Sequence, residues 1–380
     1  MQYLFVLGRE PHLSTAELEA VFLSLQISFE KVSHTATTLI ISVKKPIDAE
    51  QLMRRLGGTV KIAEEIPSEG TTTQTITTTL GKTEDERKIH FCINGENAKQ
   101  IGIQVKKSLK SAGRSVRYIE ANNTATILHN HLVIREADFT IVGKQVFVTR
   151  AIQPIEEFSA RDYERPAFDD RSGMLPPKLA RMMINLSQAT PKRDILLDPF
   201  CGSGTVLMEA VDMQFQHVIG SDMSEIAVSN TEENLTWLQE QLTSDGTNKR
   251  SEVKLFVSEI TALSRHIKPK SVSTIITEPY MGKPLTGRET RSNLTNQAEE
   301  LAELYADAFI SYARILKDNG VVVCIIPEFN YRGEWLRVPC LPDIEHAGFV
   351  VSSLGQSHSP LSYWRKDQHV KRMIWRFVKK

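Results

Sequence analysis

The chain has 380 residues, of which 41% are hydrophobic and 24% charged, and this is the balance of a globular protein. Its formal net charge is zero, so overall charge does not indicate a nucleic-acid partner. The length predicts two or three domains. The longest apolar runs, such as 321–327, are too short to cross a membrane, which argues against an integral membrane protein.

The four cysteines are far apart and form no CxxC pair, which argues against both a disulfide framework and a zinc site. They are Cys92, Cys201, Cys324 and Cys340. The first residues, "MQYLFVLGRE", have no basic leader and indicate a strand instead of a signal peptide. We therefore expect a cytoplasmic protein with no bound metal.

Charge is unevenly distributed along the chain. Residues 99–117 hold six basic residues and no acidic one, whereas residues 191–240 hold two basic and nine acidic ones. The last twenty residues hold seven basic residues and one acidic residue. Each run is also compatible with an ordinary solvated helix face.

Residues 1–65 have the pattern of a small α+β unit. Strands are predicted at 3–8, 37–43 and 60–66, and helices at 13–25 and 48–56. Ser14 and Glu17 form the pattern of a capping box at the start of the first helix. The Thr-rich stretch 67–79 is poorly patterned and predicts a loop or linker.

Residues 66–150 predict a second α+β unit. A strand at 88–94 is followed by an amphipathic helix at 97–113 that carries the basic run. A strand-like stretch that includes "LHNHL" comes next, and then a hairpin at 138–153 that turns at Gly143-Lys144. Residues 151–175 have little periodicity and predict an ordered connector.

From residue 176 the pattern changes to helices alternating with apolar strands. Such strands are buried on both faces, so residues 176–380 predict a parallel sheet covered by helices. The expected strands are 194–200, 217–222, 253–259, 272–279 and 320–328, with a terminal pair after Gly348. The expected helices are 176–187, 205–213, 224–242 and 297–320, with Gly320 ending the last.

The stretch "LLDPFCGSGTVLMEA" predicts a ligand site. Asp198 ends a strand, Gly202 and Gly204 form a tight turn, and a helix begins near Thr205. Ligands of open α/β sheets bind at the carboxyl ends of the strands. The turn is not the dinucleotide fingerprint, because Leu207 stands where the third glycine would be, and no Lys-Ser/Thr pair of a phosphate loop follows.

Two further strand ends carry carboxylates. Asp222 stands twenty residues after Gly202, where a carboxylate can bind both ribose hydroxyls, and Glu259 ends the third strand near the expected nucleobase. Asp198 would repel a diphosphate but suits a sulfonium or ammonium group. Together these residues predict a site for an adenosine with a positively charged tail.

These motifs resemble a known family. "DPFCGSGT" is similar to the cofactor motif of class I methyltransferases that act on exocyclic amines of nucleic acid. With "RDYERPAFDDRSGMLPPKLARMMINL" and the opening "YLFVLGREPHLSTAELEAVF", the chain resembles the THUMP-domain tRNA guanosine-N2 methyltransferases over nearly its whole length.

The resemblance implies an α/β fold with a Rossmann-like class I methyltransferase domain at 176–380. A ferredoxin-like unit at 1–65 and a THUMP-like RNA-binding domain at 66–150 would precede it, joined by the connector at 151–175. It implies S-adenosyl-L-methionine as cofactor and tRNA as substrate. Family members in some lineages also work with a small zinc-binding activator subunit.

The resemblance also implies roles for individual residues. Residues that would close over the cofactor are Arg165, Pro166 and the segment from Gly173 to Pro177. Residues that would bind the cofactor are Asp198, Pro199, Cys201, Gly202, Gly204, Asp222, Met223 and Glu259. Basic residues that would bind RNA are Lys99, Lys106, Lys110 and Arg114.

The stretch "IITEPYMG" (275–282) follows the fourth strand of this domain. In amine methyltransferases that strand ends in Asp/Asn-Pro-Pro-Tyr/Phe. An amino nitrogen on a base is a poor nucleophile because its lone pair is delocalised into the ring, so the site must accept its hydrogens. The Asp or Asn side chain is one acceptor. A backbone carbonyl is the other, because proline cannot continue the strand pairing and leaves this carbonyl without a strand partner. The aromatic ring stacks on the flipped-out base.

Here Pro279 and Tyr280 match the motif, but Thr277 and Glu278 replace its first two residues. A threonine hydroxyl accepts without charge, whereas a charge-assisted bond would be about twice as strong. Glu278 can supply a carboxylate only if the backbone turns, because successive strand side chains point to opposite faces. We keep all four as candidate catalytic residues, beside the alternative of a plain strand corner.

The loop after this motif is basic. Lys283, Arg288 and Arg291 follow the expected reaction site, as phosphate-neutralising residues would. The C-terminal stretch combines Tyr363 and Trp364 with basic residues, a mixture suited to single-stranded RNA.

Three functions fit these observations. The first is methylation of the N2 amine of a guanosine in tRNA, and the second is N6-adenine methylation of DNA or RNA. The third, motivated by the altered motif, is an inactive cofactor- and RNA-binding partner subunit. The number of methyl groups, the tRNA position and the oligomeric state stay open.

Overall fold

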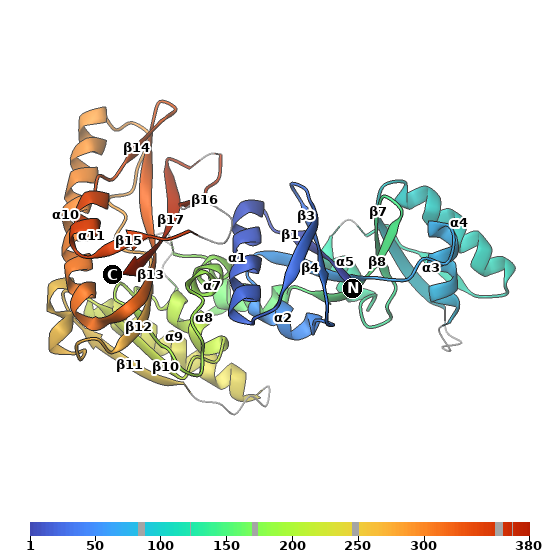
Figure 1. Ribbon diagram of the computed structural model, residues 1–380, viewed down its shortest axis with the longest axis horizontal. Coiled ribbons are helices and arrows are strands. Elements are labelled where there is room, and N and C mark those ends of the chain that lie inside the picture. The colour runs from blue at the N-terminus through green and yellow to red at the C-terminus, as the bar shows by residue number, and fades with distance from the viewer. Residues whose placement is uncertain (83–87, 122, 169–173, 245–250, 354–359, 367) are drawn as a thin grey trace. The chain divides into compact units, whose positions relative to one another are not determined.

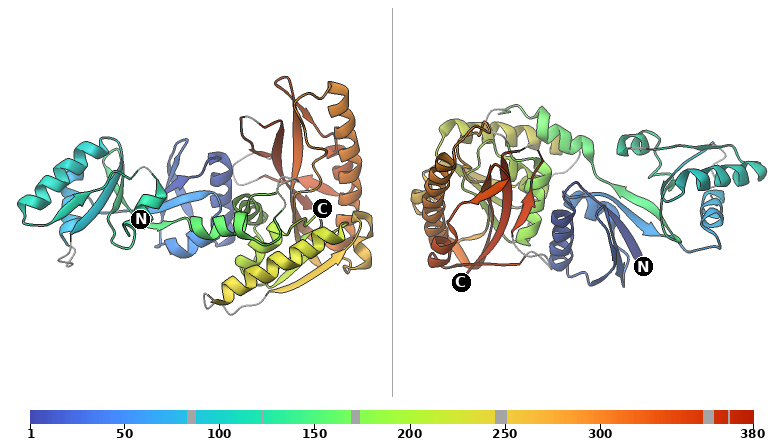
Figure 2. Two further views of the ribbon diagram at one scale, coloured as in Figure 1. Left: turned by 180° about the vertical axis from the view of Figure 1, so that it is seen from behind. Right: turned by 90° about the horizontal axis from the view of Figure 1, so that it is seen from above.

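The computed structural model divides the chain into two compact units (Figures 1 and 2). The first unit comprises Met1–Pro11 and Ile27–Pro154, and the second comprises His12–Gln26 and Ile155–Lys380. The structure describes residues 1–380 except 83–87, 122, 169–173, 245–250, 354–359 and 367. Gly173, which was expected to close over the cofactor, therefore lies outside the described residues.

The first unit contains an eight-stranded sheet in the order β2-β3-β1-β4-β8-β7-β5-β6. Its pairs are antiparallel, except that β5 lies parallel to both β6 and β7. The hairpin predicted around Gly143-Lys144 is confirmed as β7 and β8. The strands are β1 (Gln2–Leu7), β2 (Phe29–His34), β3 (Thr38–Val43), β4 (Thr59–Glu65), β5 (Ile89–Gly95), β6 (Val116–Tyr118), β7 (Asp138–Val142) and β8 (Gln145–Ile152).

The helices of this unit correct two predictions. The stretch 67–79 is not only loop, because α3 begins at Thr72 after a capping box between Thr71 and Gln74. The strand-like stretch at "LHNHL" is instead the end of a short helix that Asn123 caps. The helices are α2 (Ala49–Arg55), α3 (Thr72–Gly81), α4 (Ala98–Ser111) and α5 (Thr124–His129).

A buried ion pair joins strands from the two halves of this sheet. Lys61 Nζ on β4 lies 2.6 Å from Asp138 Oδ2 on β7, and Asp138 is fully buried. Thr149 on β8 and Asn94 on β5 donate further hydrogen bonds to the same carboxylate. One sheet thus contains strands from both the predicted 1–65 and 66–150 units. The domain boundaries 1–65, 66–150, 151–175 and 176–380 remain predictions.

The second unit contains a nine-stranded sheet in the order β11-β10-β9-β12-β13-β17-β15, with β14 paired to β13 and β16 to β17. The five strands from β11 to β13 are parallel to one another, whereas β17 is antiparallel to both β13 and β15. The strands are β9 (Ile195–Asp198), β10 (His217–Asp222), β11 (Glu252–Val257), β12 (Val272–Thr277), β13 (Leu316–Tyr331), β14 (Glu334–Arg337), β15 (Phe349–Val351), β16 (Leu361–Tyr363) and β17 (Val370–Lys379).

Helices cover both faces of this sheet, as the uninterrupted apolar strands predicted. Residues of α7 and α8 share one buried cluster with Leu196 and Ile276, and residues of α10 share a second cluster with Leu197 and Ile275. Figure 2 shows α10 and α7 on opposite sides of the strands. The helices are α1 (Pro11–Ser24), α6 (Ile155–Ser159), α7 (Pro177–Ser187), α8 (Thr205–Asp212), α9 (Glu225–Ser244), α10 (Arg291–Ile315) and α11 (Leu341–His346), with a π-helical turn η1 (Ala160–Glu164) and a 3-10 helix η2 (Ile260–Arg265).

Two predicted helix ends in this unit are wrong. Helix α1 begins at Pro11, so Ser14 and Glu17 lie inside the helix and are buried instead of forming a capping box. Asn185 Nδ2 on α7 donates a hydrogen bond to Glu17, which explains the buried carboxylate. Helix α10 ends at Ile315, and Gly320 lies within β13.

The strand order reverses beside β9, whose neighbours are β10 on one side and β12 on the other. The carboxyl ends of these strands, Asp198, Asp222 and Thr277, therefore lie at the topological switch point, where open α/β sheets bind ligands. Among the described residues, every helix is too short or too polar to span a lipid bilayer.

Candidate functional site

The glycine turn after β9 has the backbone that its sequence predicts. Gly202 and Gly204 both have positive φ, at 53° and 86°, a region that side-chain-bearing residues rarely adopt. Nothing lies within 4 Å of a Cβ built on Gly202, so the turn borders open space. Thr231 on α9 packs against Gly204, and its hydroxyl donates to the carbonyl oxygen of Gly202 at 2.8 Å.

Asp222 joins this turn to the end of β10. The backbone N–H of Gly202 donates to Asp222 Oδ2 at 3.1 Å, and the N–H of Ser224 donates to Oδ1 at 3.0 Å. The residue is half-buried. Each carboxylate oxygen keeps a lone pair after its single backbone bond, so Asp222 can accept further hydrogen bonds from ligand hydroxyls.

Asp198 is a buried carboxylate at the centre of the switch point. It is 2% exposed, and burial raises its pKa to about 7. Its Oδ1 accepts hydrogen bonds from the Thr277 hydroxyl at 2.7 Å and from the Phe200 N–H at 3.1 Å, and both bonds favour the ionised form. Thr277 is itself fully buried, so its hydroxyl serves Asp198.

Glu278 forms an ion pair with a residue that the sequence analysis missed. Arg372 Nε on β17 donates to Glu278 Oε1 at 2.6 Å, and about 14% of the Glu278 side chain is exposed. Burial raises the pKa of Glu278, and the Arg372 charge opposes that shift. The two residues are 94 positions apart, so no local pattern could have linked them.

Pro279 and Tyr280 lie directly after this ion pair. Pro279 is buried, whereas Tyr280 is 56% exposed, which is unusual for a large ring. The Tyr305 hydroxyl on α10 donates to the Tyr280 carbonyl oxygen at 2.8 Å and so fixes the backbone there. An exposed ring on a fixed backbone is an available stacking surface.

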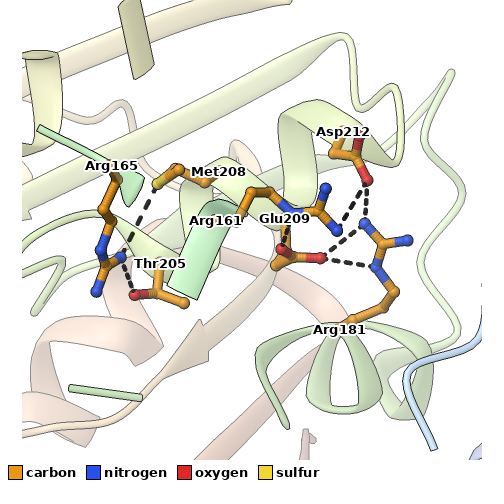
Figure 3. Close-up of polar contacts among 7 residues, drawn as sticks. All are labelled: Arg161, Arg165, Arg181, Thr205, Met208, Glu209 and Asp212. Carbon is orange, nitrogen blue, oxygen red and sulfur yellow. Dashed lines mark hydrogen bonds and ion pairs between the residues drawn. The ribbon is translucent and has the colours of Figure 1, made fainter. Parts of the chain in front are cut away.

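Arg165, at the end of the connector turn η1, contacts the start of α8 (Figure 3). Its Nη1 donates to Thr205 Oγ1 at 2.7 Å, and the guanidinium also approaches Met174 and Met208. The residue is buried, which lowers its pKa. Its Nε has no hydrogen-bond partner among the described residues.

A buried network of four charges lies beside Arg165 (Figure 3). Glu209 Oε1 accepts from Arg161 Nε at 2.6 Å, and Glu209 Oε2 accepts from Arg181 Nε at 2.7 Å. Asp212 also pairs with both arginines. The network fastens the connector and α7 to α8, the helix that follows the glycine turn.

The remaining predicted cofactor residues occupy different environments. Pro199 and Cys201 are buried within the turn, and Pro177 is the buried first residue of α7. Met223, 76% exposed, and Glu259 border the ends of β10 and β11. The structure therefore brings the glycine turn and the predicted carboxylates to one edge of the sheet.

The predicted RNA-binding residues are on the surface, with different partners. On α4, Lys99 and Lys110 are exposed, Lys106 is half-buried, and Lys99 Nζ lies 3.1 Å from a Glu120 oxygen. Arg114, just beyond that helix, is half-buried. In the second unit, Lys283 and Arg288 are exposed, and Arg291 forms a two-bond ion pair with Glu334.

This fold and site define a class I methyltransferase, the class that uses S-adenosylmethionine. Residues 165–330 match the family of RMKL-like methyltransferase domains, and residues 83–233 match a DNA methylase family. The crystal structure of TrmN from Thermus thermophilus resembles this one over 100% of both chains, with a TM-score of 0.52 and 17% identity. At that identity the likeness concerns the fold.

Curated archaeal relatives give the family. A tRNA (guanine(10)-N2)-dimethyltransferase of Methanothermobacter thermautotrophicus is 29% identical over 196 residues, 50% of this chain and 49% of that protein. A protein of Methanothermococcus thermolithotrophicus named "Probable tRNA (guanine(10)-N2)-dimethyltransferase" is 31% identical over 144 residues, 37% of this chain and 82% of that protein. The chain belongs to this family, although it spans only about half the length of the Methanothermobacter relative.

The residues at the switch point fit S-adenosylmethionine. The turn is open at Gly202, Asp222 can accept from hydroxyls, and Asp198 in its ionised form would favour a sulfonium. The buried Nε of Arg165 offers a donor suited to a carboxylate. No lysine or arginine lies within residues 198–205 to bind phosphate, which agrees with a cofactor that has none.

Proposed function

We propose that this protein methylates the exocyclic N2 amine of a guanosine in tRNA. The observation that carries the proposal is the Glu278–Arg372 ion pair, which holds a carboxylate beside an exposed Tyr280 at the cofactor edge of the sheet. Membership of a family that includes tRNA guanine-N2 enzymes supports the choice of amine and substrate.

S-adenosylmethionine would supply the methyl group on a sulfonium. We propose that the turn residues Gly202 and Gly204 admit it, that Asp222 accepts from its ribose hydroxyls, and that Asp198 faces its positive charge. Met223 and Glu259 would border its adenine. Pro199, Cys201, Arg165 and Pro177 would shape the turn and cover it.

Glu278 would accept the N–H groups of the guanine edge. The Thr277 hydroxyl already donates to Asp198, so the side-chain acceptor that the usual Asp or Asn supplies is left to the next residue, Glu278. Burial raises the Glu278 pKa, and the Arg372 charge opposes this rise and so favours the ionised form. The Glu278 carbonyl precedes Pro279 and would serve as a second acceptor, and Tyr280 would stack on the flipped base.

A second candidate function is N6-adenine methylation of DNA or RNA, because residues 83–233 match a DNA methylase family. A carboxylate can accept from adenine N6 as it can from guanine N2. Nucleoside analysis distinguishes methylated guanosine from methylated adenosine. Absence of both products would indicate an inactive partner subunit.

The test is transfer of tritiated methyl from S-adenosylmethionine to unmodified tRNA, with analysis of the digested nucleosides. We expect label in N2-methylguanosine, and loss of transfer with retained cofactor binding in Tyr280→Ala. Label in an adenosine would overturn the substrate. Cofactor and tRNA binding without any transfer would favour the inactive partner.

The partners and compartment are also proposals. We infer that the chain acts in the cytoplasm, because its four cysteines are buried free thiols, as a reducing compartment favours. From the family resemblance, we also propose a small activator subunit as a partner. Full turnover by the isolated chain would contradict that partner, and turnover only after adding a cell extract would support it.

A further inference from the structure

The end of β13 forms a hairpin that extends the sheet beyond the candidate site. Thr277, the last residue of β12, pairs with Cys324, whereas residues Glu328 to Tyr331 of β13 pair with β14. Arg332 and Gly333 make the turn, both with positive φ. At about 3.3 Å per residue, Glu328 lies roughly 13 Å beyond the end of β12. The hairpin therefore stands at the carboxyl edge, where Glu278 and Tyr280 leave the sheet.

His369 contacts both the hairpin and the loop that leads away from Tyr280. The His369 carbonyl oxygen accepts from the Asn330 N–H at 2.8 Å, and a Cβ built on Gly287 would lie 2.7 Å from His369 Nε2. The ion pair between Arg291 and Glu334 joins the start of α10 to β14. Loop 282–290 and the hairpin thus form one continuous surface.

This surface is positively charged. Residues 282–291 and 328–337 together hold five basic and three acidic residues. Two of the acids are neutralised by ion pairs: Glu328 lies 3.1 Å from Arg337 and 3.8 Å from Lys371, and Glu334 lies 2.6 Å from Arg291. Arg332 at the hairpin tip is exposed, as are Lys283 and Arg288 in the loop.

Aromatic rings accompany these charges. Trp335 on β14 and Trp364 after β16 meet edge to face, with ring centroids 5.5 Å apart. Lys371 Nζ lies 3.9 Å above the Trp335 ring, and the Arg332 guanidinium lies 5.4 Å from the Tyr331 ring. Both tryptophans are half-buried, so ring surface remains accessible beside the cations.

We propose that this hairpin surface, residues 328–337 with loop 282–290, binds the RNA strand that flanks the target nucleotide. The inference rests on the proposed function, because it takes RNA as the substrate. Exposed cations beside accessible rings are the combination that binds single-stranded RNA, by phosphate attraction and base stacking. RNA is favoured over a protein partner because the cations outside the ion pairs named above, Lys283, Arg288 and Arg332, outnumber the remaining acid, Glu289, and because the surface lies beside Tyr280.

The test measures tRNA affinity of the full chain against salt concentration for Arg332→Glu, Arg332→Lys and the control Arg193→Glu. Arg193 is an exposed arginine before the amino end of β9, at the opposite edge of the same sheet. Arg332→Glu should weaken tRNA binding by about fivefold or more and lower the salt slope by about 1. Arg332→Lys should stay near wild type, and all three variants should bind S-adenosylmethionine unchanged.

Two results would overturn the inference: wild-type tRNA affinity in Arg332→Glu, or an equal loss in Arg193→Glu. This readout is independent of turnover. If wild type transferred no methyl group to guanosine while Arg332→Glu still lost tRNA affinity, the proposed function would fail and the RNA surface would stand. If wild type methylated guanosine normally while Arg332→Glu bound tRNA as tightly as wild type, the proposed function would stand and the RNA surface would fail.

Discussion

The Thr277 hydroxyl donates a hydrogen bond of 2.7 Å to the buried carboxylate of Asp198. This bond connects the end of the fourth parallel strand to the cofactor motif of the first. It explains how threonine can stand where related enzymes have an acidic or amide residue, since its role here concerns Asp198. In the proposed function, the charged acceptor for the base is therefore Glu278.

Replacing Thr277 by valine tests this relationship. Valine keeps the branched shape but removes the donor, so the Asp198 pKa should rise further and stability should fall by about 1–3 kcal/mol. Thr274→Val on the same strand is the matched control, because its hydroxyl donates to the Val321 carbonyl at 3.2 Å and not to Asp198. Thermal unfolding and cofactor titration check both variants. Equal cofactor affinity in the two variants would contradict the assigned role.

Cofactor affinity should depend on pH through Asp198. Burial raises its pKa from 3.8 to about 7, so the carboxylate is partly protonated at neutral pH. A sulfonium prefers the ionised form, so affinity for S-adenosylmethionine should rise with pH up to about 7 and then level off. Affinity for uncharged S-adenosylhomocysteine should change less. Calorimetry between pH 5.5 and 8 decides, and identical profiles for the two ligands would exclude Asp198 as the facing charge.

The same shift has a consequence for stability. The folded chain holds the Asp198 proton more tightly than the unfolded chain does. The contribution of Asp198 to the free energy of unfolding is therefore largest at low pH and falls as pH rises from about 4 to about 7. Across this pH range, the free energy of unfolding of wild type should fall by on the order of a few kcal/mol relative to that of Asp198→Asn. Paired unfolding curves measure the difference, and a constant difference would contradict the raised pKa.

Arg372 should set the pH profile of turnover. Burial raises the Glu278 pKa and Arg372 lowers it, so Arg372→Gln should leave Glu278 protonated to higher pH. The acid limb of the rate profile should move toward alkaline pH, and Arg372→Lys should restore part of the wild-type profile. A loss of rate that is uniform across pH would point to a merely structural role for Arg372.

Replacing Gly204 by alanine tests whether the glycine turn takes part in cofactor binding. Its φ of 86° strains any other residue, and a Cβ there would lie 2.9 Å from Thr231 Cγ2. Gly204→Ala should lose about 1 kcal/mol of stability from strain and also weaken cofactor binding by displacing Thr231. Gly348→Ala has similar strain, with φ of 94° and nothing within 4 Å, and should keep full cofactor affinity. Equal affinities in the two variants would contradict a role for the turn in binding.

The sequence predicted those parts of the fold whose signals are local. Uninterrupted apolar strands indicated the parallel sheet, and the spacing of Gly202 and Gly204 after Asp198 indicated the turn. Strand β2 escaped prediction because it lies at the sheet edge and is largely exposed, so it lacks apolar alternation. Helix α3 escaped because threonine is a weak helix former, although Ile76 and Leu80 are buried at helical spacing.

The parts of the site that depend on tertiary contacts could not be predicted. Arg372 reaches Glu278 from the last strand, and Thr231 reaches Gly202 from the middle of α9. Neither has a neighbouring motif that indicates its partner. The buried Arg161–Glu209 pair likewise joins the connector to α8 across 48 positions.

The central claim, methylation of guanosine N2 in tRNA, is tested most directly by mass spectrometry of tRNA nucleosides from cells with and without the gene. We expect N2-methylated guanosine to fall in tRNA from cells that lack the gene, and to return with wild-type chain but not with Glu278→Gln. Unchanged N2-methylated guanosine, or loss of a methylated adenosine instead, would contradict the claim.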